Sequence, residues 1–291
     1  RDIYTDVIRT RMEKHIFNIF ESGRQTASVK KTNPAVCLSF EIELYGRAYS
    51  FEAACADSDI LLKDIVHPAC QISDFIVGKA IEHQKRIGHP VSCSAGCMAC
   101  CKYAITVSLA EAFAIQDMIN GLSGSNKQSI QKKMTRAGEK ILKSCIWRAK
   151  AAQVQDAGAS SQLVEFSRWY SAMDLACPWL EKKLCTEYSG RPLVCREFLV
   201  SSVPDRCSAK ASYGRTVVDF PISMAEVLMS VCAELTHTSP VAILLPLVQA
   251  ECEDYSDLQT MYFDSRQVTE ILIETIHQHQ QRLAAATPVC C

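Results

Sequence analysis

The feature that most constrains this chain is a crowding of cysteines. The sequence VSCSAGCMACC, residues 91–101, places four thiols within nine residues among small side chains. Four more cysteines follow at wider spacing in residues 177–207. Eight thiols in two segments have three uses: disulfide bonds, a metal or iron–sulfur centre, or a nucleophile with spare neighbours. Composition and spacing in the rest of the sequence favour one of these uses over the others.

Composition favours a soluble protein of a reducing compartment, and we expect a cytoplasmic location. A chain of 291 residues buries enough core to fold without disulfide staples, although it carries 16 cysteines. No charged and apolar leader opens the sequence at Arg1. The longest apolar run, residues 240–248, is shorter than the roughly 18 residues of a membrane span. Adjacent cysteines and cysteines two apart also pair only with strain, so disulfides are disfavoured.

The charge balance excludes two classes of partner. The formal net charge is −1, and the basic pairs at residues 30–31 and 85–86 are short. Nucleic acids and anionic membranes attract extended basic surfaces. We therefore expect no nucleic acid and no membrane as partner.

Hydrophobic periodicity in the first part of the chain predicts helices around a small β element. Helical spacing covers residues 1–22 and 58–89, with Pro68 breaking or restarting the second helix. Residues 36–44 alternate between apolar and polar, and a Tyr-Gly-Arg turn joins them to residues 48–54. This pattern predicts a β-hairpin.

The remainder of the chain reads as helices on both sides of an irregular segment. Ser108 and Glu111 form a capping box, which predicts a helix from there to about residue 120. Residues 177–222 contain many Pro and Gly and are expected to be irregular. Further helices are predicted at residues 127–155, 161–176, 223–235 and 267–285.

These elements give a mainly α fold: a helical domain with a small β-hairpin and two cysteine-bearing irregular loops around a metal centre. We divide the chain into an N-terminal helical segment with the hairpin (1–89), a cysteine-cluster metal-binding domain (90–210) and C-terminal helices that pack on the same core (211–291).

The cysteine spacing suits metal coordination. Cys97 and Cys100 have the two-residue gap that lets two thiolates face one ion, at about 2.3 Å per bond for zinc. The side chains of Cys100 and Cys101 diverge because the residues are adjacent, so one tetrahedral ion does not take both. Eight thiolates then suit either two zinc-like sites or one polynuclear centre.

The two cysteine segments resemble a known family. Cys-x3-Cys-x2-Cys-Cys, followed by Cys-Pro-x-Leu and Cys-x2-Tyr-x2-Arg-Pro-x2-Cys-Arg-x-Phe, is similar to the YkgJ-type cysteine-cluster proteins over roughly residues 90–210. These are described as zinc- or iron-chelating domains, and flagellin lysine-N-methylases are related to them. The resemblance implies zinc or iron bound by eight thiols, of which the last is the weakest assignment: Cys93, Cys97, Cys100, Cys101, Cys177, Cys185, Cys195 and Cys207.

Three polar residues of the second segment are candidates for contacts around the centre or to a cofactor. Arg191 and Arg196 are able to offset thiolate charge or to bind a carboxylate or phosphate of a substrate. Alternatively, they pair with Glu187 and Glu197 at the surface. Tyr188 belongs to the same motif, and simple packing is the alternative for it.

Two other cysteine chemistries remain open. Cys-x3-Cys-x2-Cys is also the spacing that radical S-adenosylmethionine enzymes use for a [4Fe-4S] cluster, although Ala99 stands where those enzymes usually have an aromatic residue. A helical chain lacks their βα barrel, but an iron–sulfur cluster in another fold stays open. A nucleophilic cysteine needs a histidine nearby, and His89 is the candidate.

Other reactive side chains are assigned structural places. We expect His277 and His279 to face partly to solvent, and the acidic residues at 251–254 to be a solvated turn. The pair Cys290 and Cys291 is treated as a disordered end. Small buried hydrophobes are the expected role of the remaining cysteines: Cys37, Cys55, Cys70, Cys145, Cys232 and Cys252.

The leading hypothesis is a metalloprotein whose two cysteine loops converge on a zinc- or iron-containing centre. An alternative, suggested by the methylase kinship, is an S-adenosylmethionine-dependent protein methylase that uses the centre on a lysine of a protein substrate. A second alternative is a metal carrier or chelator. The sequence assigns no catalytic residue.

Overall fold

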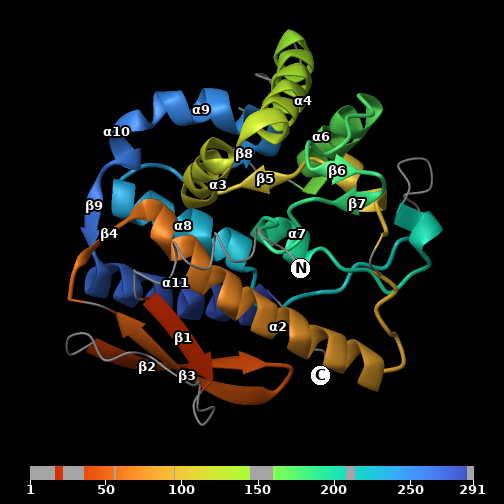
Figure 1. Ribbon diagram of the computed structural model, residues 1–291. Helices are drawn as coiled ribbons and strands as arrows, with labels where there is room; N and C mark the ends of the chain where they lie inside the picture. The colour runs from red at the N-terminus through yellow and green to blue at the C-terminus, as the bar shows by residue number, and fades with distance from the viewer. Residues whose placement is uncertain are drawn as a thin grey trace.

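A three-stranded antiparallel sheet, ordered β1-β3-β2, forms one layer of the molecule (Figure 1). The computed structural model describes residues 17–21, 36–55, 57–94, 96–144, 160–207 and 214–286. β2 (Val36–Leu44) and β3 (Arg47–Cys55) pair along their whole length through a turn at Tyr45 and Gly46. Both turn residues have positive φ, +54° and +75°, as a two-residue hairpin requires. The predicted hairpin is confirmed.

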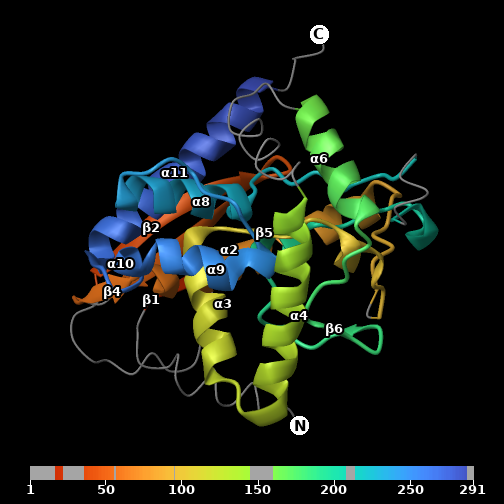
Figure 2. The same cartoon turned by 90° about the horizontal axis from the view of Figure 1, so that it is seen from above.

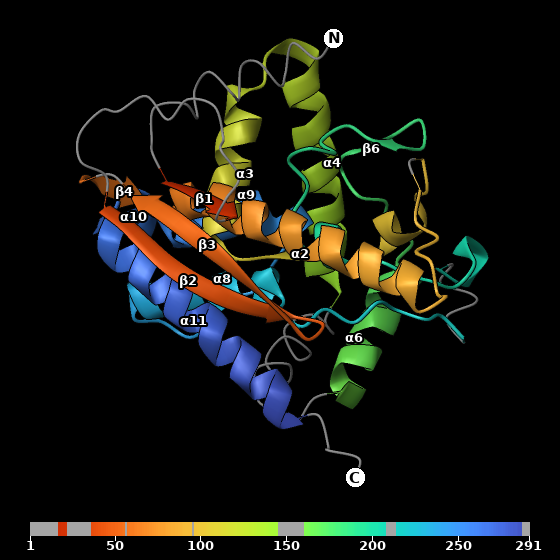
Figure 3. The same ribbon diagram turned by 90° about the horizontal axis from the view of Figure 1, so that it is seen from below.

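The inner face of the sheet packs on two long helices, α2 (Val66–Arg86) and α11 (Ser265–Ala286), as Figure 3 shows from below. Phe40 and Phe51 stack across the hairpin at 5.3 Å between ring centroids, and Phe51 meets Phe75 of α2 edge-on at 5.0 Å. Polar residues alternate onto the outer face. The period-two pattern of the sequence therefore sets which face is buried.

Two predicted helical stretches have a different structure. Residues 17–21 form strand β1 (Phe17–Glu21), which supplies backbone partners to the free edge of β3, while residues 1–16 lie outside the described residues. Residues 59–61 form strand β4 (Asp59–Leu61), and a 3₁₀ turn then leads into α2. Pro68 lies in the first turn of α2, where a missing N–H costs no helical hydrogen bond, so the helix restarts there as expected.

The other helices follow the predicted order (Figure 2). The capping box is confirmed: the Ser108 hydroxyl accepts the Glu111 N–H at 3.3 Å, and the Glu111 carboxylate accepts the Ser108 N–H at 2.9 Å. Three short helices, α7, α9 and α10, were not expected, and α7 lies within residues 177–222, which were predicted to be irregular. The helices are α3 (Leu109–Gly121), α4 (Gly124–Lys143), α6 (Ser160–Ala172), α7 (Leu193–Glu197), α8 (Met224–Thr236), α9 (Val248–Asp254) and α10 (Ser256–Gln259).

Short antiparallel pairs join distant parts of the chain. β4 pairs with β9 (Tyr262–Asp264), β5 (Thr106–Val107) with β8 (Ile243–Leu244), and β6 (Leu180–Glu181) with β7 (Leu184–Cys185). The main hydrophobic cluster takes residues from all three predicted segments, including Ile72, Phe113 and Leu272. The second cysteine loop packs on this cluster through Cys177, Cys185 and Cys195, whereas Val91 of the first loop packs on a smaller cluster. None of the described helices is long and apolar enough to cross a membrane.

The cysteines outside the two loops divide between core and surface. Cys55, Cys232 and Cys252 are buried as expected, and Cys70 is half-buried. Cys37 is exposed, because it falls on the polar face of β2. Cys145, Cys290 and Cys291 lie outside the described residues.

Two other expectations were wrong in part. His277 is partly exposed as expected, but His279 is buried, and its Nε2 lies 2.9 Å from a Glu226 carboxylate oxygen. Residues 251–254 lie at the end of α9 and not in a turn; Glu253 and Asp254 are exposed as expected, whereas Glu251 is half-buried and burial raises the pKa of its carboxyl.

Candidate metal centre

The first cysteine loop leaves the end of α2 and is pinned to the chain that follows α7. The Ser92 N–H donates to the Val200 carbonyl at 2.9 Å, and the Val200 N–H donates in turn to Cys93 Sγ at 3.4 Å. Gly96 has φ +84°, a left-handed conformation that suits glycine. A 3₁₀ turn, η2 (Ala99–Lys102), then carries Cys100 and Cys101.

The second loop contains a tight hairpin that the sequence did not reveal. Lys182 and Lys183 form its turn, both with positive φ, and β6 and β7 pair Leu180 with Cys185. This places Cys177, which precedes β6, at the same end of the hairpin as Cys185. Glycine and asparagine usually mark such a turn, so two lysines gave no signal.

Backbone amides lie near the thiols of this hairpin. The Leu180 N–H donates to the Cys177 carbonyl at 3.0 Å. Burial raises the pKa of Cys177 to about 11, and the nearby backbone amides of Trp179 and Leu180 act in the opposite direction. At Cys185 the amide of Glu187 likewise opposes the effect of burial, so backbone amides offset part of the cost of ionising both thiols.

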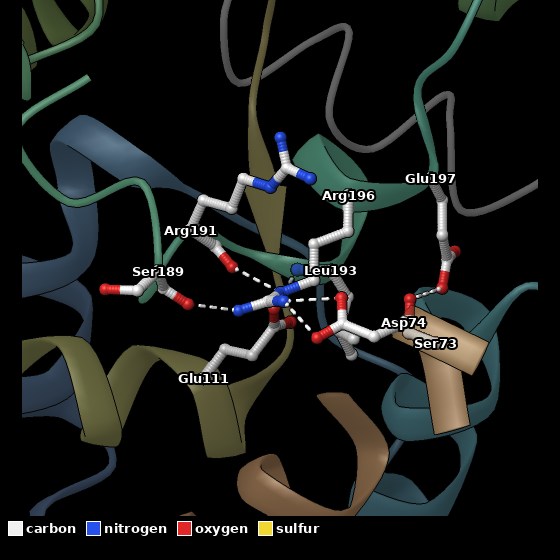
Figure 4. A network of polar contacts seen from close by, with 8 residues as sticks. All are labelled: Ser73, Asp74, Glu111, Ser189, Arg191, Leu193, Arg196 and Glu197. Carbon is white, nitrogen blue, oxygen red and sulfur yellow. Dashed lines mark hydrogen bonds and ion pairs between the residues drawn. The ribbon is translucent and has the colours of Figure 1, made fainter. Parts of the chain in front are cut away.

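A buried polar network fixes α7, the short helix that carries Cys195 (Figure 4). The Leu193 N–H donates to the Glu111 carboxylate at 2.8 Å, so the capping residue of α3 also holds the start of α7. The Glu197 carboxylate accepts from Ser73 of α2 at 2.9 Å and from the Met224 N–H of α8 at 3.0 Å. Sequence reasoning missed these contacts because their partners are far apart along the chain.

The two cysteine loops meet at a backbone hydrogen bond. The Cys177 N–H donates to the Cys101 carbonyl at 2.7 Å. The interaction between the Cys100 and Cys101 thiols raises the pKa of Cys100 and lowers that of Cys101. Burial raises the pKa of Cys195, and nearby Cys177, Cys100 and Cys185 raise it further. Thiols from both loops are therefore close enough to repel one another when ionised.

Cys207 joins the same region from the other side. It is buried at the end of a 3₁₀ turn, η3 (Pro204–Cys207), and the Tyr103 hydroxyl donates to its carbonyl. A small cavity of about 20 Å³ lies between this turn and the first loop. Four cysteines contribute to its lining: Cys93, Cys97, Cys100 and Cys207.

The comparison with protein families gives a match at this point. Residues 92–214 match the model of the CxxCxxCC family, described as "Putative zinc- or iron-chelating domain". The match covers 123 of the 291 residues, and we refer to this segment as the CxxCxxCC domain after the family that it matches. All eight cysteines of the two loops lie within it. Comparisons with curated proteins and with solved structures gave no match.

Arg191 is the arginine of the CxxCxxCC domain that faces the thiols. Burial raises the pKa of Cys93, Cys185 and Cys195, and the Arg191 guanidinium opposes this shift at all three. The guanidinium carbon lies 4.3 Å from the centre of the exposed Tyr188 ring, a cation–π contact. The Arg191 Nε is buried without an acceptor among the described residues.

Arg196 does not have the place that the sequence suggested. Its guanidinium donates to both carboxylate oxygens of Asp74, at 2.6 and 2.9 Å, and to the carbonyls of Ser189 and Arg191 (Figure 4). The expected surface pair with Glu197 is also wrong, because Glu197 caps α8. Arg196 links α7 to α2, and its positive charge is paired with the Asp74 carboxylate.

His89 and the thiols form no nucleophile pair of the expected kind. His89 is exposed, and its backbone N–H donates to the Gln84 carbonyl at 2.9 Å. The lowered pKa of Cys101 has Cys100 as its main cause, not a histidine. The geometry favours thiols acting together over one activated cysteine.

The donor set of the CxxCxxCC domain fits zinc or iron in its chemistry. All eight cysteines are free thiols, Arg191 opposes the effect of burial on the pKa of several of them, and thiolates are preferred ligands of both metals. Within the part of the chain that the structure describes, no three His, Cys, Asp or Glu side chains already stand in an arrangement that would hold an ion. Binding therefore needs thiol side chains to turn toward a shared point.

Proposed function

We propose that the CxxCxxCC domain holds zinc or iron through the thiols of its two cysteine loops. The observation that carries this proposal is the meeting of the loops at the Cys177 N–H and the Cys101 carbonyl, 2.7 Å apart. This contact gathers free thiols that are far apart in sequence. The proposed ligands are Cys93, Cys97, Cys100, Cys101, Cys177, Cys185, Cys195 and Cys207.

The residues around the thiols support this role. Arg191 would balance part of the negative charge of several thiolates, and the amides of the β6-β7 hairpin would hold Cys177 and Cys185 in place. Pro178 and Pro192 restrict the backbone beside two ligands, which reduces the entropy lost on binding. The bound metal would supply the covalent links that irregular loops lack.

A binding role is better supported than methyl transfer. The thiols are free, and four of them line a cavity of about 20 Å³ that has room for a water-sized group. We propose a domain that holds its metal in a reducing compartment, where the thiols stay free.

Elemental analysis of protein purified without oxygen, combined with its visible absorption, tests the proposal. We expect zinc without colour, or iron with the brown absorption of a cluster. Cys195→Ser should hold less metal than wild type, and Cys37→Ser, an exposed thiol on β2, should hold the same amount. Metal-free wild type, or equal metal in both variants, would refute the proposed function.

A further inference from the structure

We infer that the eight cysteines form two neighbouring four-thiol sites, each built from both loops, and that one exchanges its metal faster than the other. This inference rests on the proposed function. The outer site comprises Cys93, Cys97, Cys100 and Cys207, and the inner site comprises Cys101, Cys177, Cys185 and Cys195.

The outer site is assembled around the cavity between η2 and η3. Its four cysteines line this cavity of about 20 Å³ together with Phe198, Val200 and Pro204. Two contacts hold lining residues in place: the Val200 N–H donates to Cys93 Sγ at 3.4 Å, and the Tyr103 hydroxyl donates to the Cys207 carbonyl. Thiols that line one cavity of water size need only turn toward it to share one small occupant.

The inner site lies against the hydrophobic core. The backbone contact between Cys177 and Cys101 joins the two loops, and the β6-β7 hairpin brings Cys185 beside Cys177. Cys177, Cys185 and Cys195 all pack on the main core cluster. These four thiols are each partly covered, whereas Cys93 and Cys97 of the outer site are exposed.

The division falls between two adjacent residues. Cys100 lines the cavity, whereas the backbone carbonyl of its neighbour Cys101 accepts the Cys177 N–H. The Cys100 and Cys101 thiols lie close enough to interact, so the two sites would be adjacent.

The two sites should differ in how firmly they hold an ion. Core packing restricts the inner thiols before metal arrives, and contacts around metal ligands change metal affinity by about 10- to 100-fold. Exposed thiols beside a cavity allow a competing ligand to enter at the outer site. We expect the outer metal to be the exchangeable one.

Metal content and release kinetics of the full chain test this inference. A chromophoric chelator, 4-(2-pyridylazo)resorcinol, is mixed with anaerobically purified protein, and the rise in absorbance is followed. We expect release in two phases, the faster at least about tenfold above the slower. In the double variant Cys93→Ser/Cys97→Ser, the fast phase should vanish and about half the metal should remain.

The controls separate this inference from the proposed function. Cys37→Ser should keep both phases. Cys177→Ser/Cys185→Ser should lose the slow phase, and the outer variant decides the question alone if that protein does not fold. An outer variant that loses all of its metal or none, or a wild type that releases metal in one phase, would overturn the two-site division while leaving metal binding intact. A wild type without metal would overturn both.

Discussion

The sheet with its supporting helices and the pair of cysteine loops differ in what holds them together. Around the sheet, regular elements bury apolar side chains such as Phe40, Ile72 and Leu272. Around the cysteines, the chain is largely irregular, and backbone contacts, polar networks and thiols connect it. Periodic burial of apolar side chains stabilises the first region. The second region contains few regular elements, and a buried charge network and the proposed metal would stabilise it.

The largest expected difference appears when the metal is removed. A strong chelator should raise amide hydrogen exchange in residues 92–103 and 177–207 and leave α8 and α11 protected. Binding of a structural zinc ion contributes on the order of 10 kcal/mol to folding, and none of it acts directly on the sheet region. Hydrogen exchange with mass spectrometry measures this. Equal change in both regions would show that the division into two regions is wrong.

A smaller but still large effect is expected at the junction of the regions. Arg196→Met removes the ion pair with Asp74 and leaves the carbonyls of Ser189 and Arg191 without their donor. We expect a loss of about 3 kcal/mol in the free energy of unfolding, at the lower end for a buried pair because Asp74 is more than half exposed. Urea titration measures the loss.

Two further variants serve as comparisons for the stability loss of Arg196→Met. Asp74→Asn keeps a hydrogen-bond acceptor and should cost less than Arg196→Met. Lys143→Met removes a surface pair with Glu139 and should stay within about 0.5 kcal/mol of wild type. An Arg196→Met protein as stable as Lys143→Met would mean that the network in Figure 4 does not join the loops to the helices.

The smallest effect is expected within the helical region and depends on pH. The hydrogen bond from His279 lowers the pKa of Glu226 below its ordinary value. Because the folded pKa is lowered, the stabilisation is present above the unfolded pKa of about 4.3 and disappears as pH falls through the folded value. The Glu226 side chain is largely exposed, so we expect less than about 1 kcal/mol.

Glu226→Gln tests this by comparison with wild type between pH 6 and pH 3. The difference in unfolding free energy should shrink toward zero at the acid end, and effects of acid on the thiols are common to both proteins and cancel. A difference that grows on acidification would contradict the assignment.

Sequence reasoning was most accurate where signals are local. Alternation in residues 36–44 predicted β2, and Ser108 with Glu111 predicted the start of α3. It was wrong where contact with a distant segment of the same chain decides the local structure. Residues 17–21 form a strand because β3 offers an open edge. Glu111 was identified as a cap, but its bond to Leu193 depends on how α7 packs.

The sequence by itself determined the donors: which residues are thiols, that they come in two loops, and that their spacing suits metal. Spacing along a chain controls geometry only over a few residues, because side-chain directions are set by local backbone angles. The tertiary structure decided that Cys177 meets Cys101, that Cys207 shares a cavity with Cys93, and that Arg191 rather than Arg196 faces the thiols. These contacts join segments brought together by burial of the common core, and no local pattern encodes them.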